Sequence, residues 1–147
     1  MTLRRTFDPA FLNQEKDERA IEFGRKFHAL SPWRHERYDP EASRVFVHAM
    51  QENPDGYYLC TNDGFIGGVL TPMWFAPDTV LAVELFWYSE KTGEGQRLRN
   101  AFESWAKQRG AKYIQFSALA DAHEPAVRRI MARSGYDAIE IGFRKTL

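Results

Sequence analysis

The chain has 147 residues, of which 44% are hydrophobic and 27% are charged, and its 20 basic and 20 acidic side chains balance to a formal net charge of zero. This length fits one domain of the usual ~100–200 residues, so we expect a single domain over residues 1–147. The composition excludes wholesale disorder, and the balanced charge argues against a global attraction to nucleic acid or to a membrane.

Cysteine and histidine usage narrows the chemistry further. Cys60 is the single cysteine, which excludes a disulfide within the chain and a cluster of cysteine ligands. The four histidines lack a metal-binding spacing, so we expect no metal site. No apolar run approaches the ~20 residues of a membrane helix. Arg4 and Arg5 are not followed by the apolar stretch of a signal peptide, and we expect a cytoplasmic location.

The first third of the chain predicts one short strand and two helices. Residues 3–7 form a candidate edge strand. Apolar residues then recur at three-to-four spacing, which predicts an amphipathic helix over residues 11–30. Asp39 and Pro40 are a helix-start signal, because aspartate caps and proline suits the first helical position. We expect a second helix over residues 40–52.

The middle of the chain changes to the period of strands. Residues 57–61 and 65–70 are strand-like, and the Asn-Asp-Gly turn between them indicates a hairpin. Residues 72–78 are expected to form a loop. Val80 to Tyr88 contains a single charge, Glu84, and such a run suits a central strand that is covered on both faces.

The last third predicts two helices that alternate with two strands. A helix opens at Gly93-Glu94-Gly95 and ends at Gly110, which suits the residue after a helix C-terminus. Residues 111–118 follow as a strand. A short helix starts at Pro125, and a last strand covers residues 136–143. In the short helix, three apolar side chains should face inward: Val127, Ile130 and Met131.

The resulting order, β-α-α-β-β-β-α-β-α-β, predicts a mixed α/β (α+β) domain. About four helices should flank a mixed central sheet. If the strands at 80–88 and 111–118 are parallel, the helix between them makes a crossover that should be right-handed.

The junction from the strand at 80–88 into the next helix carries the most informative chemistry. Gly93 and Gly95 permit a tight turn and the close approach of a ligand. Unpaired amides at a helix start, together with the helix dipole, bind anions such as phosphate. A plain strand–helix turn would use the same residues. Two other nucleotide motifs fail, because Leu98 replaces the third glycine of the dinucleotide fingerprint and Gln96 replaces the Walker lysine.

This junction resembles the GNAT N-acetyltransferase superfamily, whose acetyl-CoA signature is Arg/Gln-x-x-Gly-x-Gly/Ala after a long strand. Residues 90–95, Glu-Lys-Thr-Gly-Glu-Gly, occupy that slot. The strings at 70–75 (Leu-Thr-Pro-Met-Trp-Phe), 84–88 (Glu-Leu-Phe-Trp-Tyr) and 135–136 (Gly-Tyr) are similar to a phage-associated branch. The resemblance covers nearly the whole chain and is strongest over residues 65–110.

The resemblance implies a GNAT-type enzyme that uses acetyl-CoA as co-substrate and no metal. The acceptor would be an amine-bearing small molecule or a peptide, attacking directly, and a dimer is common in the family. The strand at 80–88 would splay from the strand at 111–118 and hold pantetheine, with the thioester near Phe86 to Tyr88 and the pyrophosphate on the loop amides. The implied cofactor-binding residues are Phe86, Trp87, Tyr88, Lys91, Thr92, Gly93, Glu94, Gly95, Gln96 and Arg97.

Four residues decide the expected mechanism: two glutamates, one tyrosine and one methionine. Glu84 is the candidate general base, because burial raises a carboxyl pKa toward neutrality; the alternative is a structural carboxylate. Tyr88, expected on the same face by the strand period, could protonate the leaving thiolate or be a core aromatic. Met131 replaces the family's usual tyrosine acid, and Glu90 replaces the usual Arg or Gln of the signature. A catalytically silent acyl-CoA-binding or interaction module therefore stays open.

Overall fold

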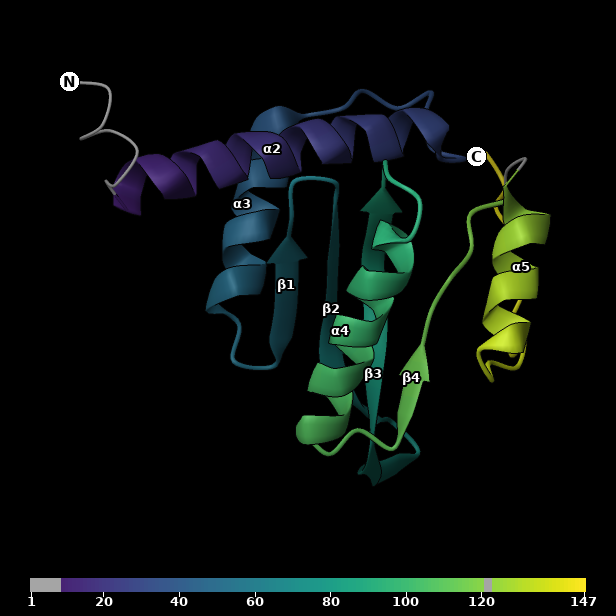
Figure 1. The fold of residues 1–147 in the computed structure, drawn as a ribbon. Helices are drawn as coiled ribbons and strands as arrows, with labels where there is room; N and C mark the ends of the chain where they lie inside the picture. Colours follow the sequence, from purple (N-terminus) through teal and green to yellow (C-terminus); the bar gives the residue numbers. More distant parts are fainter. Residues whose placement is uncertain (1–8, 121–122) are drawn as a thin grey trace. The chain divides into compact units, whose positions relative to one another are not determined.

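A computed structural model describes residues 9–120 and 123–147 (Figure 1). The chain divides into two compact units, Met1–Ser117 and Ala118–Leu147. The predicted edge strand at residues 3–7 lies outside the described residues. The helices and strands of the first unit are α2 (Pro9–Leu30), α3 (Pro40–Glu52), β1 (Gly56–Cys60), β2 (Gly64–Met73), β3 (Ala76–Ser89), α4 (Glu94–Gln108) and β4 (Tyr113–Gln115).

Local sequence signals explain where these elements begin. The Asp39 Oδ1 atom accepts hydrogen bonds from the amides of Glu41 (3.0 Å) and Ala42 (3.2 Å), so it caps α3 as its position before Pro40 predicts. Gly93 precedes α4 with a φ of +86°, which is a left-handed conformation that favours glycine. The predicted boundaries of α3 are confirmed, and α2 starts two residues earlier than expected.

The four strands form one mixed sheet in the order β1-β2-β3-β4. The first three strands are antiparallel neighbours, whereas β4 is parallel to β3. Helix α4 connects β3 to β4 across one face of the sheet, and this crossover is right-handed (Figure 1). The predicted class is confirmed: a mixed α/β fold with a mixed sheet and, with α5 of the second unit, four helices in the described chain.

A separate apolar cluster covers each face of the sheet. Helices α2 and α3 pack on one face, through Ala20, Phe23, Val47, Met50, Phe65 and Phe86. Helix α4 packs on the other, through Ile66, Ala82, Leu98, Phe102 and Ala106. The two faces are called the α2 face and the α4 face below. Strand β3 contributes buried residues to both clusters, and this explains why it is apolar over most of its length.

A β-bulge in β3 changes which face its later residues occupy. Gly67 pairs with Phe86 whereas Gly68 pairs with Glu84, so Leu85 is an extra residue on β3. A Cβ on Gly67 would lie 2.2 Å from the Phe86 ring, and a Cβ on Gly68 would lie 2.5 Å from the Phe102 ring. The paired glycines thus mark Phe86 on the α2 face and Glu84 on the α4 face.

Three sequence predictions about local structure are wrong. Residues 72–78 do not form a loop: β2 and β3 meet in a tight hairpin whose tip carries Trp74, 91% exposed. The strand predicted at 111–118 is shortened to β4, because its pairing with β3 ends at Gln115. Residues 136–143 are irregular: their alternating apolar pattern predicts a strand, but they are not part of the described sheet.

In the described part of the second unit there is one helix, α5 (Glu124–Arg133). The prediction that Val127, Ile130 and Met131 face inward is not met, because no residue of α5 is buried and Ile130 is exposed. Among the described residues, no helix is both long enough and apolar enough to span a membrane.

Candidate active site

Strands β3 and β4 separate partway along β3. Their pairing ends at Val83 and Gln115, but β3 continues to Ser89 with β2 still paired on its other side. From residue 84 to 89, no strand of the described chain pairs with the outer edge of β3. Along an antiparallel strand, the backbone amide and carbonyl of successive residues point to alternate sides. The Gly64 carbonyl and the Leu70 amide both bond to the β1 side, at Thr61 and Asp55, so Ile66 also points to β1 and not to β3. Trp87, which lies opposite Ile66, does not bond to β2. The amide and carbonyl of Trp87 therefore point to this open edge.

Glu84 lies where the two strands begin to diverge. Its side chain is buried, with 9% exposure, and its Oε2 atom accepts a hydrogen bond of 3.2 Å from the amide of Ser117, which follows β4. Burial raises the pKa of Glu84 to about 7, and the Ser117 amide partly offsets this rise by stabilising the ionised form. A carboxyl with this pKa exchanges its proton near neutral pH.

Tyr88 lies on the α2 face, so the expectation that it shares a face with Glu84 is wrong. The bulge at Leu85 adds one residue between them and breaks the period of two. The Tyr88 ring packs 5.8 Å from the ring of Phe23 in α2. Its hydroxyl donates a hydrogen bond of 3.3 Å to Glu90 Oε1, and burial followed by the Glu90 carboxylate raises the pKa of Tyr88.

The Gly-x-Gly loop leaves amides free at the start of α4. The first i→i−4 bond of the helix runs from the Arg97 amide to the Gly93 carbonyl, at 3.2 Å. The amide of Glu94 donates to the Lys91 carbonyl, and helix geometry leaves the amides of Gly95 and Gln96 without an intrahelical acceptor. A Cβ on Gly93 would meet no atom within 4 Å, so the approach to this turn is open. These features suit a phosphate group.

The side chains of the loop divide into two groups. Five of its residues are exposed at the surface around the helix start: Lys91, Thr92, Gly93, Gln96 and Arg97. The Glu94 side chain is instead buried, where its Oε1 accepts a 2.8 Å hydrogen bond from Thr61 and its Oε2 lies 3.3 Å from Arg97. The carboxylate is therefore held by the protein and turned away from the loop surface.

Aromatic residues of β3 tie the strand to its surroundings. The indole Nε1 of Trp87 donates a 3.0 Å hydrogen bond to the Gly95 carbonyl, which fixes the end of β3 against the first turn of α4. Phe86 is buried on the α2 face, 4.6 Å from the ring of Phe65. The side chains of Phe86 and Trp87 thus hold the strand in place, while their backbone runs along the opening.

Lys26 of α2 is a residue of this region that sequence reasoning missed. Its Nζ atom lies 2.5 Å from Glu90 Oε1, the same oxygen that accepts from Tyr88. The hydrogen bond and the charge of Lys26 lower the pKa of Glu90. Because 64 positions separate the two residues, no local pattern could have indicated their pairing.

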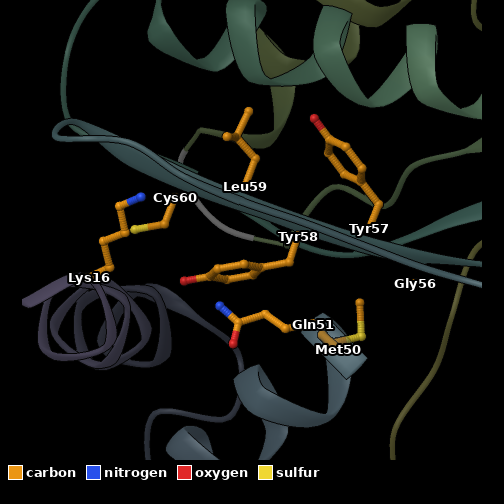
Figure 2. Close-up of a pocket in the computed structure, with 8 residues that line it drawn as sticks. All are labelled: Lys16, Met50, Gln51, Gly56, Tyr57, Tyr58, Leu59 and Cys60. Atoms are coloured by element: carbon orange, nitrogen blue, oxygen red, sulfur yellow. The ribbon is translucent and has the colours of Figure 1, made fainter. Parts of the chain in front are cut away.

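A pocket of about 420 Å³ lies elsewhere, along the edge strand β1 (Figure 2). Its lining comes from α2, α3 and β1, and consists of Lys16, Met50, Gln51, Gly56, Tyr57, Tyr58, Leu59 and Cys60. None of these is a predicted CoA residue, and β2 separates β1 from the opening beside β3. In the part of the chain that the structure describes, no three His, Cys, Asp or Glu side chains are grouped to hold a metal.

No protein-family model and no curated protein matches the sequence, but solved structures do. A putative acetyl transferase from Pyrococcus furiosus is 21% identical, with a TM-score of 0.65 over 91% of this chain and 95% of that chain. The chain has the fold of the GNAT acetyltransferases. A transcriptional regulator from Bacillus halodurans is 18% identical, with a TM-score of 0.68 over 86% and 93%. An aminoglycoside N-acetyltransferase in complex with CoA is 13% identical, with a TM-score of 0.58 over 88% and 91%.

Proposed function

We propose that this GNAT-fold protein transfers the acetyl group of acetyl-CoA to a primary amine by direct attack. The observation that carries the proposal is the continuous path from the open edge of β3 to the free amides at the start of α4. A pantetheine arm can hydrogen-bond to a strand edge, and a diphosphate can bind at a helix N-terminus. The pantetheine arm and the diphosphate of CoA could therefore bind next to each other along this path.

The solved neighbours support this choice of co-substrate. The aminoglycoside N-acetyltransferase is bound to CoA, and another structure of such an enzyme holds a bisubstrate analogue of CoA and acetylneamine. The open space beside Gly93 and the exposed loop surface leave room for the diphosphate. Acetyl-CoA supplies an activated acyl group, so the protein has mainly to position the reactants.

Glu84 is the base in this mechanism. The amine nitrogen bonds to the acetyl carbon, the bond to sulfur breaks, and the Glu84 carboxylate accepts the proton lost by the nitrogen, directly or through a water. Backbone amides along the open edge of β3 polarise the thioester carbonyl. A carboxyl pKa of about 7 suits this task, because the group is half ionised at neutral pH and still basic enough to take a proton.

Tyr88 lies on the opposite face from Glu84, and this supports a different role for it. A CoA thiolate is a tolerable leaving group, with a pKa near the ~8.5 of a free thiol. We propose that the thiolate departs without a protein acid, so that Tyr88 orients Glu90 and the loop.

The acceptor is proposed as an amine-bearing small molecule or peptide. Membership of a phage-associated branch and a homodimer are parts of the proposal that rest on the sequence resemblance. A cytoplasmic location is proposed as well.

Calorimetry with CoA and acetyl-CoA, followed by turnover with a panel of amines, tests the function. We expect CoA binding, and release of free thiol when acetyl-CoA meets a suitable amine. Bound CoA should also raise the midpoint of thermal unfolding, because a CoA concentration of 100 Kd adds roughly 2.7 kcal/mol to the free energy of unfolding. Absence of CoA binding would overturn the proposal.

A second candidate is a silent acyl-CoA-binding or interaction module. Two observations favour it: Met131 stands where the family's acid would be, and one similar structure is a transcriptional regulator. Tight CoA binding without transfer to any amine of the panel would favour this module over the enzyme.

A further inference from the structure

Glu90 presents an electrostatic problem at the start of the loop. It occupies the first position of the signature, in the loop that leads to the free amides of Gly95 and Gln96, where a diphosphate would bind. A carboxylate at this position repels an anion by Coulomb's law, and the repulsion is strongest at low ionic strength.

Packing of α2 on the sheet brings a cation to this carboxylate. Phe23 of α2 lies 5.7 Å from the Phe65 ring and 5.8 Å from the Tyr88 ring, so this helix turn is seated over the end of β3. Lys26 follows three residues later, on the same side of the helix. Its Nζ lies 2.5 Å from Glu90 Oε1.

The contacts of Glu90 also determine the direction of its side chain. Oε1 accepts from both Lys26 and the Tyr88 hydroxyl, and both partners belong to the α2 face. Helix α4, with its free amides, packs on the other face. The carboxylate is thus neutralised and also held on the side of the sheet that lies opposite α4.

We propose that Lys26 is a positioning residue of the CoA diphosphate site, which acts through Glu90 by cancelling its charge and holding its side chain on the α2 face. This inference rests on the proposed function, because it assumes that the loop binds CoA. It assigns to α2 an electrostatic contribution that the loop sequence alone does not contain.

Three variants test the proposal by calorimetry with CoA in low-salt buffer. Lys26→Met should weaken CoA binding roughly three- to tenfold, the range expected for exposed charges near a doubly charged group. Glu90→Gln should bind CoA at least as tightly as the wild type. The double variant, Lys26→Met with Glu90→Gln, should bind like Glu90→Gln, because no carboxylate is left to neutralise.

Matched controls separate this role from a structural one. Lys16→Met removes the same charge from the same helix, beside the β1 pocket, and should change CoA affinity by less than about twofold. The loss in Lys26→Met should shrink in ~1 M salt, where the Debye length falls to about 3 Å. Thermal unfolding of each variant checks that the fold is kept.

The CoA affinities of the wild type and the variants decide between the role of Lys26 and the proposed function. Wild-type affinity in Lys26→Met would overturn the inference and leave the proposed function standing. A double variant as weak as Lys26→Met would also overturn it, since Lys26 would then act on the phosphates directly. No CoA binding by the wild type would overturn the proposed function and this inference together.

Discussion

Glu84 is a titratable residue whose ionisation is changed by burial. Its carboxyl is buried on the α4 face, where Oε2 accepts a hydrogen bond from the amide of Ser117. Desolvation by burial raises the pKa of Glu84 to about 7, so the group carries a proton below neutral pH.

Glu84→Gln should lower kcat/KM by roughly 10²–10⁴-fold, which is the usual contribution of a general base. In the wild type, kcat/KM should rise with pH through about 7, because only the ionised carboxylate accepts a proton, and the variant should lack this rise. Initial rates from pH 5 to 9 measure both effects. Glu52→Gln, an exposed change at the end of α3, is the control. Equal pH profiles for Glu84→Gln and the wild type would remove Glu84 from the mechanism.

Tyr88→Phe should reduce the rate by less than the roughly 10²-fold loss that marks a general acid. The reason is that the hydroxyl donates to Glu90 on the α2 face, and the leaving thiolate needs no acid. Single-turnover rates at saturating acetyl-CoA measure the change, with Tyr113→Phe on β4 as the control. A larger loss at unchanged CoA affinity would identify Tyr88 as the acid.

At the scale of the element, α4 has two glycines in the same unusual conformation, one at each end. Gly93 has a φ of +86° and Gly110 a φ of +81°, and a Cβ on either would meet no atom within 4 Å. The two positions share the same local strain for a larger residue. They differ in location, since only Gly93 adjoins the free amides of the loop.

Gly93→Leu should therefore weaken CoA binding by about tenfold or more, because it removes charge-assisted hydrogen bonds and blocks the approach to the loop. Gly110→Leu should lose a similar stability, about 1–2 kcal/mol for a left-handed residue, but keep its CoA affinity. Calorimetry and urea denaturation of both variants provide the comparison. If both variants bind CoA equally well, the loop is no phosphate site.

The β-bulge is the second feature at this scale. If β3 continued through Leu85 as a regular strand without the bulge, Glu84 and Tyr88 would share a face, and one of the two apolar clusters would lose its contribution from the end of β3. The bulge thus lets one strand place a carboxyl on the α4 face and a hydroxyl on the α2 face, beside the same open edge.

At the scale of the whole molecule, Glu84 makes the free energy of unfolding depend on pH. Its pKa is raised in the folded protein, from an ordinary value of 4.5 to about 7. Between these values the folded chain binds more protons than the unfolded chain, so the contribution of Glu84 is full below pH 4.5 and is lost as the pH rises to 7.

Replacing Glu84 by Gln should remove this dependence. The unfolding free energy of the wild type, relative to Glu84→Gln, should fall by up to roughly 3 kcal/mol between pH 4.5 and pH 7. Urea denaturation of both proteins at several pH values measures the difference, in which the other titrating groups cancel. A constant difference over this range would show that the folded pKa of Glu84 is not raised.

The features that the sequence alone could determine depend on interactions between residues that are close together in the chain. The cap at Asp39, the glycines at 93 and 110 and the apolar stripes act within a few residues, so the helices α2, α3 and α4 and the central strand follow from local patterns. The Gly-x-Gly helix start and the single charge at Glu84 are equally visible, and they indicate both the anion site and the candidate base.

Only the tertiary structure decided how these parts meet. The bulge at Leu85 depends on fitting β3 between two cores, and it separates Glu84 from Tyr88 against the strand period. The end of β4 at Gln115 creates the open edge, and Lys26 reaches Glu90 across 64 positions through the packing of Phe23. Pairing and charge neutralisation between distant segments depend on their separation in space, and a linear pattern of residues carries no record of that distance.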